Sequence, residues 1–231
     1  MLDELKRRVC EANRALAASG LVTETWGNVS GLSRDGAHVV IKPSGLAYEA
    51  LTPEQMVVVS VEAGEVVEGD LRPSSDTPTH VELYRGLAGL GGVVHTHSLH
   101  ATAWAQAERP IPPLGTTHAD YFFGAVPCTR AMTPEEIGSD YEANTGKVVV
   151  ERFGELDPKA IPGVLVAHHG PFAWGDSPEQ AVHNAIVLEH LARLASLTVA
   201  IDPYPRAVCR ALLEKHYLRK HGPGAYYGQQ A

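Results

Sequence analysis

The residues best suited to chemistry are two histidines in the segment Val93-Val94-His95-Thr96-His97, which follows two consecutive glycines. A β-strand alternates its side chains with a period of two, so His95 and His97 would leave the same face, with Cα atoms roughly 6.5–7 Å apart. Imidazoles at that separation can bind one ion, through metal–nitrogen bonds of about 2.0–2.1 Å in the case of zinc. The alternative is a polar pair on the solvated face of an edge strand, so a metal site requires a third ligand.

A third ligand is offered by a second apolar run, Val164-Leu165-Val166-Ala167, which predicts a buried strand leading into His168 and His169. We interpret the following Gly170-Pro171 as a sharp turn that leaves a histidine at the edge of the sheet. Neighbouring residues of a strand face opposite ways, so only one of the two histidines can point at the ion, and the pattern leaves the choice open. Three histidines with one open position are typical of a catalytic divalent site.

Three short segments combine small polar side chains with residues that adopt special backbone conformations: Trp26-Gly27-Asn28-Val29-Ser30, Lys42-Pro43-Ser44-Gly45 and Pro73-Ser74-Ser75-Asp76. Backbone N–H groups at turns and at helix N-termini form anion sites, so the second and third segments are candidates for binding a phosphate, and the Gly27-Asn28 pair of the first would suit a backbone approach to a ligand. Ordinary turn chemistry and helix capping are the favoured explanation of either phosphate candidate when it is taken alone, and the first segment could be merely a turn.

Groups that could transfer protons occur in two further places. Asp120 lies in the polar segment Thr116-Thr117-His118-Ala119-Asp120-Tyr121 and could act as a general acid or base. Tyr226 and Tyr227 lie in a glycine-rich tail and could close over a site. The alternatives are a solvated loop carboxylate and a pair of tyrosines that pack the terminus against the body.

Helical and strand patterns alternate along the chain without a repeat or an interdomain linker, which favours a single layered α/β domain. Residues 147–150 fit a helix and a strand equally well. We predict strands at residues 39–41, 57–59, 65–68 and 164–167, and helices over residues 2–16, from Ser75 or Asp76 to about Leu87, from Thr133, from Ser177 to about Ser196, and from about Pro205 to Lys220.

Composition narrows the class of protein. The chain has 231 residues, 44% of them hydrophobic, enough for a substantial core without disulfides. Its net charge of −8 argues against nucleic-acid binding. Three scattered cysteines suit a reducing compartment, the charged N-terminus lacks a signal core, and no apolar run reaches the ~18 residues of a membrane span. We therefore expect a cytoplasmic protein with no membrane or nucleic-acid partner.

Seven motifs, read in order along the chain, resemble the L-ribulose-5-phosphate 4-epimerase branch of the class II aldolase/epimerase superfamily. Each motif is weak evidence by itself, but seven in order across essentially the whole chain are highly specific. They are Thr25-Trp26-Gly27-Asn28-Val29-Ser30, Ile41-Lys42-Pro43-Ser44-Gly45, the segment 73–80 from Pro73 to His80, His95-Thr96-His97-Ser98, the segment 115–121 from Gly115 to Tyr121, the segment 169–175 from His169 to Gly175, and the segment 215–222 from Lys215 to Gly222.

The resemblance implies one three-layer α/β/α domain over residues 1–231, built around a mostly antiparallel sheet. It also implies a homotetramer with active sites between neighbouring subunits. The implied cofactor is Zn²⁺, with Mn²⁺ or Co²⁺ as alternatives that the same ligands could bind.

The resemblance also assigns roles to residues. The metal ligands would be His95, His97 and His169, with Asp76 as a further acidic group at the metal. Asp120 and Tyr227 would be the paired proton donors and acceptors, contributed across the subunit interface. Substrate, chiefly its phosphate, would be bound by Gly27, Asn28, Ser44, Gly45, Ser74 and Ser75, with Thr116, Glu142 and His216 at secondary positions.

The implied reaction interconverts L-ribulose 5-phosphate and D-xylulose 5-phosphate, phosphorylated ketopentoses of an L-arabinose-type catabolic route, by breaking and re-forming the C3–C4 bond. One rival is an aldolase of the same superfamily, in which glutamate stands where this chain has Asp76. A second rival is a metal-free interaction module on the same fold, which would be expected to lack one of the three histidines.

Overall fold

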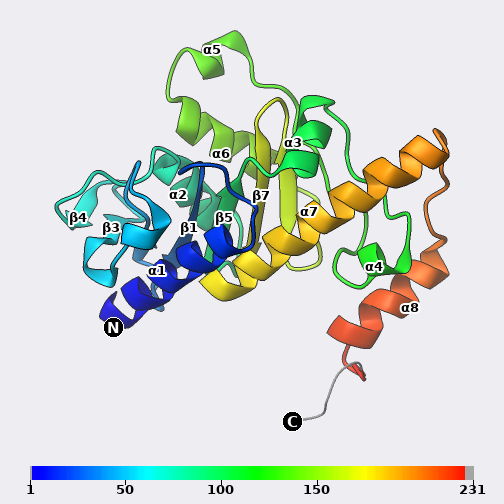
Figure 1. The fold of residues 1–231 in the computed structure, drawn as a ribbon, viewed down its shortest axis with the longest axis horizontal. Helices are drawn as coiled ribbons and strands as arrows, with labels where there is room; N and C mark the ends of the chain where they lie inside the picture. The colour runs from blue at the N-terminus through cyan, green and yellow to red at the C-terminus, as the bar shows by residue number, and fades with distance from the viewer. Residues whose placement is uncertain (1, 227–231) are drawn as a thin grey trace.

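A seven-stranded sheet forms the centre of the computed structural model, which describes residues 2–226 (Figure 1). Its strand order is β4-β3-β2-β1-β5-β7-β6, and each pair of neighbours is antiparallel. The predicted α/β fold around a mostly antiparallel sheet is therefore confirmed. The strands are β1 (Gly27–Leu32), β2 (His38–Ile41), β3 (Val57–Ser60), β4 (Val66–Glu68), β5 (Gly92–Thr96), β6 (Gly163–Val166) and β7 (Gly170–Gly175).

Helices cover both faces of the sheet, because the inner strands are apolar on both sides. On one face α1 and α7 pack against β1 and β5, and on the other α2 and α6 pack together (Figure 1). The helices are α1 (Leu2–Ala18), α2 (Thr77–Gly86), α3 (Leu99–Gln106), α4 (Thr116–Ala119), α5 (Pro134–Ile137), α6 (Tyr141–Arg152), α7 (Pro178–Ile201) and α8 (Arg210–His221), with short 3-10 turns at Tyr48–Ala50 and Pro53–Gln55.

Strand β1 shows how the two layers are assigned. A Cβ on Gly31 would lie within 3 Å of Leu5 and Pro178, so α1 and α7 approach this face closely. On the opposite face, Ser30 Oγ lies 2.7 Å from His80 Nδ1 and 2.9 Å from the Tyr84 hydroxyl, both on α2. Because neighbouring residues of a strand face opposite ways, Gly31 makes the apolar contact on one face of the sheet and Ser30 makes the polar contact on the other.

Several predicted boundaries change in the structure. Residues 147–150 lie within α6, and α7 continues five residues beyond Ser196. The prediction of a helix from Pro205 is wrong, because α8 begins at Arg210. Pro205 could begin a helix, but Val208 N donates to the distant Pro113 O at 2.9 Å, which holds the segment before α8 in a non-helical path.

Helix α7 begins directly over the start of β5. A Cβ on Gly92 would lie 2.5 Å from the backbone nitrogen of Pro178, and one on Gly91 would lie 2.1 Å from Asp176 O. Gly91 and Gly92, at the start of the histidine strand, therefore permit a close backbone approach that any larger residue would prevent.

Among the described residues, α7 is the one helix long and apolar enough for a membrane span, with a mean hydropathy of 1.3 over its best window. Core helices of soluble proteins pass the same test, so one such helix is weak evidence. In the structure α7 packs along β7 and β5 and buries Leu188 and Leu191 against them.

Candidate metal centre and adjoining pocket

His95 is fixed in the middle of the sheet. Its strand pairs with β1 and β7, which sets His95 opposite Asn28 on one side and Phe172 on the other. The buried imidazole stacks on the Phe172 ring, with centroids 4.2 Å apart. His95 Nδ1 lies 3.0 Å from Pro171 O, and because a carbonyl can only accept, Nδ1 carries the proton. The lone pair of Nε2 is therefore available to a metal.

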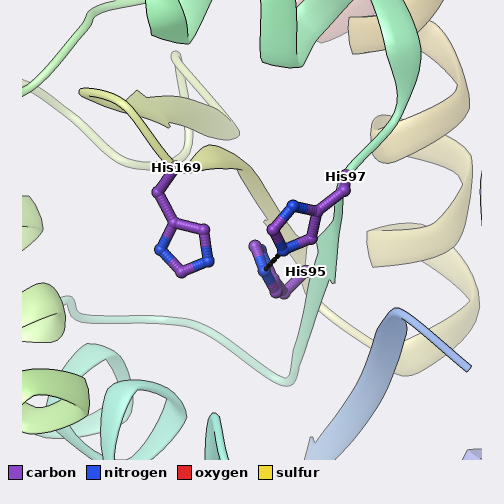
Figure 2. A group of neighbouring side chains, drawn as sticks. All are labelled: His95, His97 and His169. Atoms are coloured by element: carbon purple, nitrogen blue, oxygen red, sulfur yellow. Dashed lines mark hydrogen bonds between the residues drawn. The ribbon is translucent and has the colours of Figure 1, made fainter.

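His97 lies just beyond the end of β5, which stops at Thr96. It nevertheless turns toward the same space as His95, and the two Nε2 atoms are 3.1 Å apart (Figure 2). Two nitrogens bound to one tetrahedral zinc would be about 3.3 Å apart, given bonds of about 2.0–2.1 Å. Their separation thus suits a shared ion.

His169 completes the group from the β6–β7 turn. The structure corrects the predicted turn: Gly170 and Pro171 belong to β7 and pair with Val166 and Leu165, while the chain reverses over residues 167–169. His168 adopts a left-handed conformation, with φ of 62°, and its Nε2 lies 3.3 Å from Glu108 Oε1. The reversal therefore directs His168 to the surface and His169 toward the other two histidines.

The three side chains present one ligand atom each, all within 4.8 Å of one another (Figure 2). The buried Nδ1 of His169 has no hydrogen-bond partner in the described protein, an arrangement that metal binding would satisfy. Burial lowers the pKa of all three imidazoles, that of His95 to about 3, so the neutral, ligating form is favoured. The donor set fits a divalent ion such as Zn²⁺.

Asp76 borders the cluster without belonging to it. It is the N-cap residue of α2, but its side chain makes no capping bond and instead accepts from Asn28 Nδ2 at 2.6 Å. Burial alone would raise the pKa of this carboxyl, but His95, His80 and the bond from Asn28 outweigh that effect and lower it. Asp76 is therefore a charged carboxylate beside the histidines.

A pocket of about 520 Å³ opens beside His95 and His97. Much of its wall comes from the three segments that the sequence marks as candidates for binding a ligand, which the fold brings together. Ser44 N donates to Arg72 O and Ser74 N donates to Lys42 O, each at 2.9 Å, so two of these loops are joined directly. All six predicted substrate-binding residues line the pocket: Gly27, Asn28, Ser44, Gly45, Ser74 and Ser75.

Lys42 also lines the pocket and was not among the predicted site residues. It is almost fully buried, and burial lowers the pKa of its ammonium to about 8. Its Nζ donates to Pro43 O at 3.2 Å and lies 5.0 Å from the Tyr48 ring centroid. No carboxylate of residues 2–226 forms an ion pair with the Lys42 ammonium, so an anion bound in the pocket would be its charged partner. The available signal was a lysine immediately before Pro-Ser-Gly at a strand end.

Asp120 belongs to a different part of the chain. It follows α4, and its carboxylate accepts two bonds from Arg219, at 3.0 and 2.7 Å, and one from His216 at 3.0 Å. Burial opposes ionisation, but these partners on α8 lower the pKa of Asp120 overall. Asp120 does not line the histidine pocket, and α4 and α8 lie together at the end of the molecule away from α1 (Figure 1).

The remaining predicted residues are placed as follows. Thr116 begins α4, four residues before Asp120, and Glu142 lies in the first turn of α6, where its carbonyl accepts from Thr79 Oγ1 at 2.6 Å. Tyr227 lies outside the described residues.

A model of the class II aldolase and adducin N-terminal domain matches residues 7–196. The chain belongs to this family. Its fold is similar to that of an L-fuculose 1-phosphate aldolase, with a TM-score of 0.77 and 23% identity over 92% of this chain and 94% of the other. It is also similar to YgbL of Klebsiella pneumoniae, a candidate aldolase/epimerase/decarboxylase, with a TM-score of 0.73 and 25% identity over 93% and 98%.

A further similar structure is the L-fuculose-1-phosphate aldolase of Thermus thermophilus, with a TM-score of 0.68 and 23% identity over 88% of this chain and 100% of that one. Class II aldolase relatives typically use a divalent metal on sugar phosphates, and the histidine cluster of this class II aldolase homologue suits such an ion. The metal-free module considered above is disfavoured, because all three histidines are present and converge.

We expect His169→Ala to weaken zinc binding by more than about 100-fold, because it removes one of three imidazole ligands. The matched control is His168→Ala, which removes an imidazole from the same turn that faces Glu108 instead. Competition with a chromophoric chelator measures both affinities. Tight zinc binding by His169→Ala, or equal losses in the two variants, would contradict this ligand assignment.

Proposed function

We propose that this class II aldolase homologue is a metal-dependent L-ribulose-5-phosphate 4-epimerase, which interconverts L-ribulose 5-phosphate and D-xylulose 5-phosphate. The observation that carries the proposal is that a three-histidine cluster adjoins a pocket lined by small hydroxyl residues and a buried ammonium. Such a pocket suits a substrate with metal-binding oxygens at one end and a phosphate at the other. A cytoplasmic role in L-arabinose-type catabolism belongs to the same proposal.

The phosphate end of the pocket is assigned to the two serine-containing loops. Ser44 and Gly45 follow β2, and Ser74 and Ser75 precede α2, so the two loops bring three serine residues to the wall of the pocket. Lys42 would add a positive charge with little competition from other partners, and a buried charge interacts strongly with an anion. We therefore assign Lys42 to phosphate binding alongside the six predicted residues.

Epimerisation at C4 is difficult by simple proton removal, because the C4 hydrogen is not adjacent to the C2 carbonyl. Breaking the C3–C4 bond avoids this difficulty: the electron pair moves toward the carbonyl, and the C4 hydroxyl loses its proton to become an aldehyde. A divalent ion at the histidine cluster would supply Lewis-acid stabilisation of the ketose oxygens. The aldehyde fragment, held by its phosphate, then presents its other face before the bond re-forms.

Inversion at C4 needs a proton acceptor on one face of the aldehyde and a proton donor on the other. We assign these roles to Asp120 and Tyr227. Because Asp120 does not line the pocket of its own chain, we propose that a neighbouring copy supplies it, in a homotetramer with active sites at subunit interfaces. Thr116, Glu142 and His216 are proposed secondary residues of the same site.

The choice between epimerase and aldolase rests on Asp76. The resembling aldolases carry a glutamate there as their base, whereas the shorter carboxylate of this chain is engaged by Asn28. We therefore assign Asp76 to the surroundings of the metal and not to proton transfer at the nucleophilic carbon.

The direct test incubates the zinc-loaded enzyme with L-ribulose 5-phosphate and measures D-xylulose 5-phosphate with a coupled assay. We expect conversion that is lost on chelation and restored by Zn²⁺, Mn²⁺ or Co²⁺. Asp120→Asn should lose about 10²–10⁴-fold in kcat while keeping its metal, and Tyr227→Phe likewise. Trapping stoichiometric glycolaldehyde phosphate without D-xylulose 5-phosphate would show an aldolase instead.

Shared active sites predict complementation between inactive variants. His169→Ala removes the metal side of the site, and Asp120→Asn removes the proton-transfer side. Co-refolded or subunit-exchanged mixtures of equal amounts should recover about a quarter of wild-type activity. With random neighbours, about one interface in four joins a subunit with an intact histidine cluster to a neighbour with an intact Asp120. Mixtures that stay as inactive as the separate variants, despite mass-spectrometric evidence of hybrid oligomers, would contradict an interfacial site.

The role of Lys42 predicts a pH dependence. Burial lowers the pKa of Lys42 to about 8, so the cation is present below that pH and is lost above it. We expect KM to rise about tenfold per pH unit above about pH 8, because the phosphate loses a charged partner. Lys42→Arg stays charged throughout and should abolish the inflection. A wild-type KM that is flat across this range would argue against the assignment.

A further inference from the structure

Trp26 stands apart from the other tryptophans. Trp104 and Trp174 are buried, and their indole N–H groups donate to Ala192 O at 3.1 Å and Pro158 O at 2.8 Å. Trp26 is 57% exposed and lines the pocket beside the histidine cluster. An exposed indole is an unusual use of the largest apolar side chain, and at a pocket it suggests a role in binding.

The backbone holds Trp26 at the pocket wall. Trp26 N donates to Thr23 O at 3.0 Å, closing a tight turn in which Glu24 adopts a left-handed φ of 52°. On the other side, the Tyr48 hydroxyl donates to Gly27 O at 2.8 Å, and the φ of 148° at Gly27 is open to glycine but not to larger residues. The backbone that carries the indole is thus well anchored, so the turn itself loses little conformational freedom on binding.

The rest of the pocket is strongly polar. Apart from Trp26, the apolar side chain in its wall is that of Pro43, and the other lining residues carry hydroxyl, amide, ammonium, carboxylate or imidazole groups or are glycines. An acyclic sugar phosphate has polar groups along its whole length, but the carbons between its ends also carry C–H groups. An aromatic face suits those C–H groups, because it removes apolar surface from water without competing for hydrogen bonds.

We propose that Trp26 is a substrate-binding residue whose indole packs against the carbon chain of an acyclic sugar phosphate. The inference deepens the proposed function and rests on it for the nature of the substrate. Trp26 would hold the chain between the serine loops and the histidine cluster. It is a binding residue with no proton to transfer in the reaction.

Steady-state kinetics on the zinc-loaded enzyme give the first test. We expect Trp26→Ala to raise KM for L-ribulose 5-phosphate about tenfold and Trp26→Phe about threefold, with kcat within about twofold of wild type, as for loss of uniform binding. Tyr204→Ala, which removes an 89% exposed aromatic that does not line the pocket, is the matched control and should leave KM unchanged. Unchanged KM in both Trp26 variants would overturn the proposal.

Tryptophan fluorescence gives a second test that does not depend on turnover. The chain has three tryptophans, and Trp26 is the exposed one, so saturable emission changes on adding the pentulose phosphate to zinc-loaded enzyme should vanish in Trp26→Phe. Inorganic phosphate occupies the serine loops alone and should change the emission less. Changes that persist in Trp26→Phe, or a wild-type enzyme whose emission does not respond, would overturn the proposal.

The two tests separate this inference from the proposed function. A wild-type enzyme that binds the pentulose phosphate with a Trp26-dependent signal, but forms no D-xylulose 5-phosphate, contradicts the epimerase and supports the role of Trp26. An enzyme that epimerises its substrate, but whose KM and emission response are unchanged by substitution of Trp26, supports the epimerase and contradicts the role of Trp26.

Discussion

The register of β5 between its two neighbours is the constraint on which the site depends. Antiparallel pairing sets His95 opposite both Asn28 and Phe172, so one strand position joins the pocket wall to the metal cluster. A slip of one residue would move the imidazole to the other face of the sheet and separate it from all its partners. The β6–β7 turn depends on the same register, because a Cβ on Gly170 would lie 2.8 Å from Thr96 O, just past His95.

Helix α2 is positioned by a row of polar contacts with β1, on the face of the sheet opposite to α1 and α7. Asp76, His80 and Tyr84 follow one another at intervals of four residues. Asp76 contacts Asn28, and both His80 and Tyr84 contact Ser30. Asn28 and Ser30 are two residues apart on β1, so their side chains point to the same face. Burial lowers the pKa of His80 to about 4, so this ring is neutral in the network. Each such bond adds only about 0.5–1.5 kcal/mol, but leaving a buried group unpaired costs about 1–3 kcal/mol, so the row selects one placement of α2. That placement turns Asp76 away from helix capping and toward the pocket.

The sequence predicts much of this arrangement, for reasons that differ between residues. Period-two spacing brings His95 and His97 together although His97 lies beyond the strand, because the first residue after a strand often keeps its direction. The sequence could not show whether His168 or His169 is the third ligand, because the deciding feature is the left-handed backbone of His168. Lys42 and Trp26 lie in segments that the sequence marked but were not assigned as site residues, because burial of an ammonium and exposure of an indole are tertiary properties. The start of α8 was misplaced because Pro205 was read as the first helical residue, whereas Val208 N donates to the distant Pro113 O and α8 begins only at Arg210.

The structure divides the proposed chemistry between two rigid supports. The histidine cluster and pocket are fixed by the sheet, whereas Asp120 is fixed by α8, through two bonds from Arg219 and one from His216. These partners lower the pKa of Asp120, so it is charged and a weak base when the chain is alone. A proton acceptor works best when its pKa lies near the operating pH. Contact with a neighbouring pocket would remove water from this carboxylate and raise its pKa toward that range. Assembly of the oligomer would then both complete the site and tune the group that it brings.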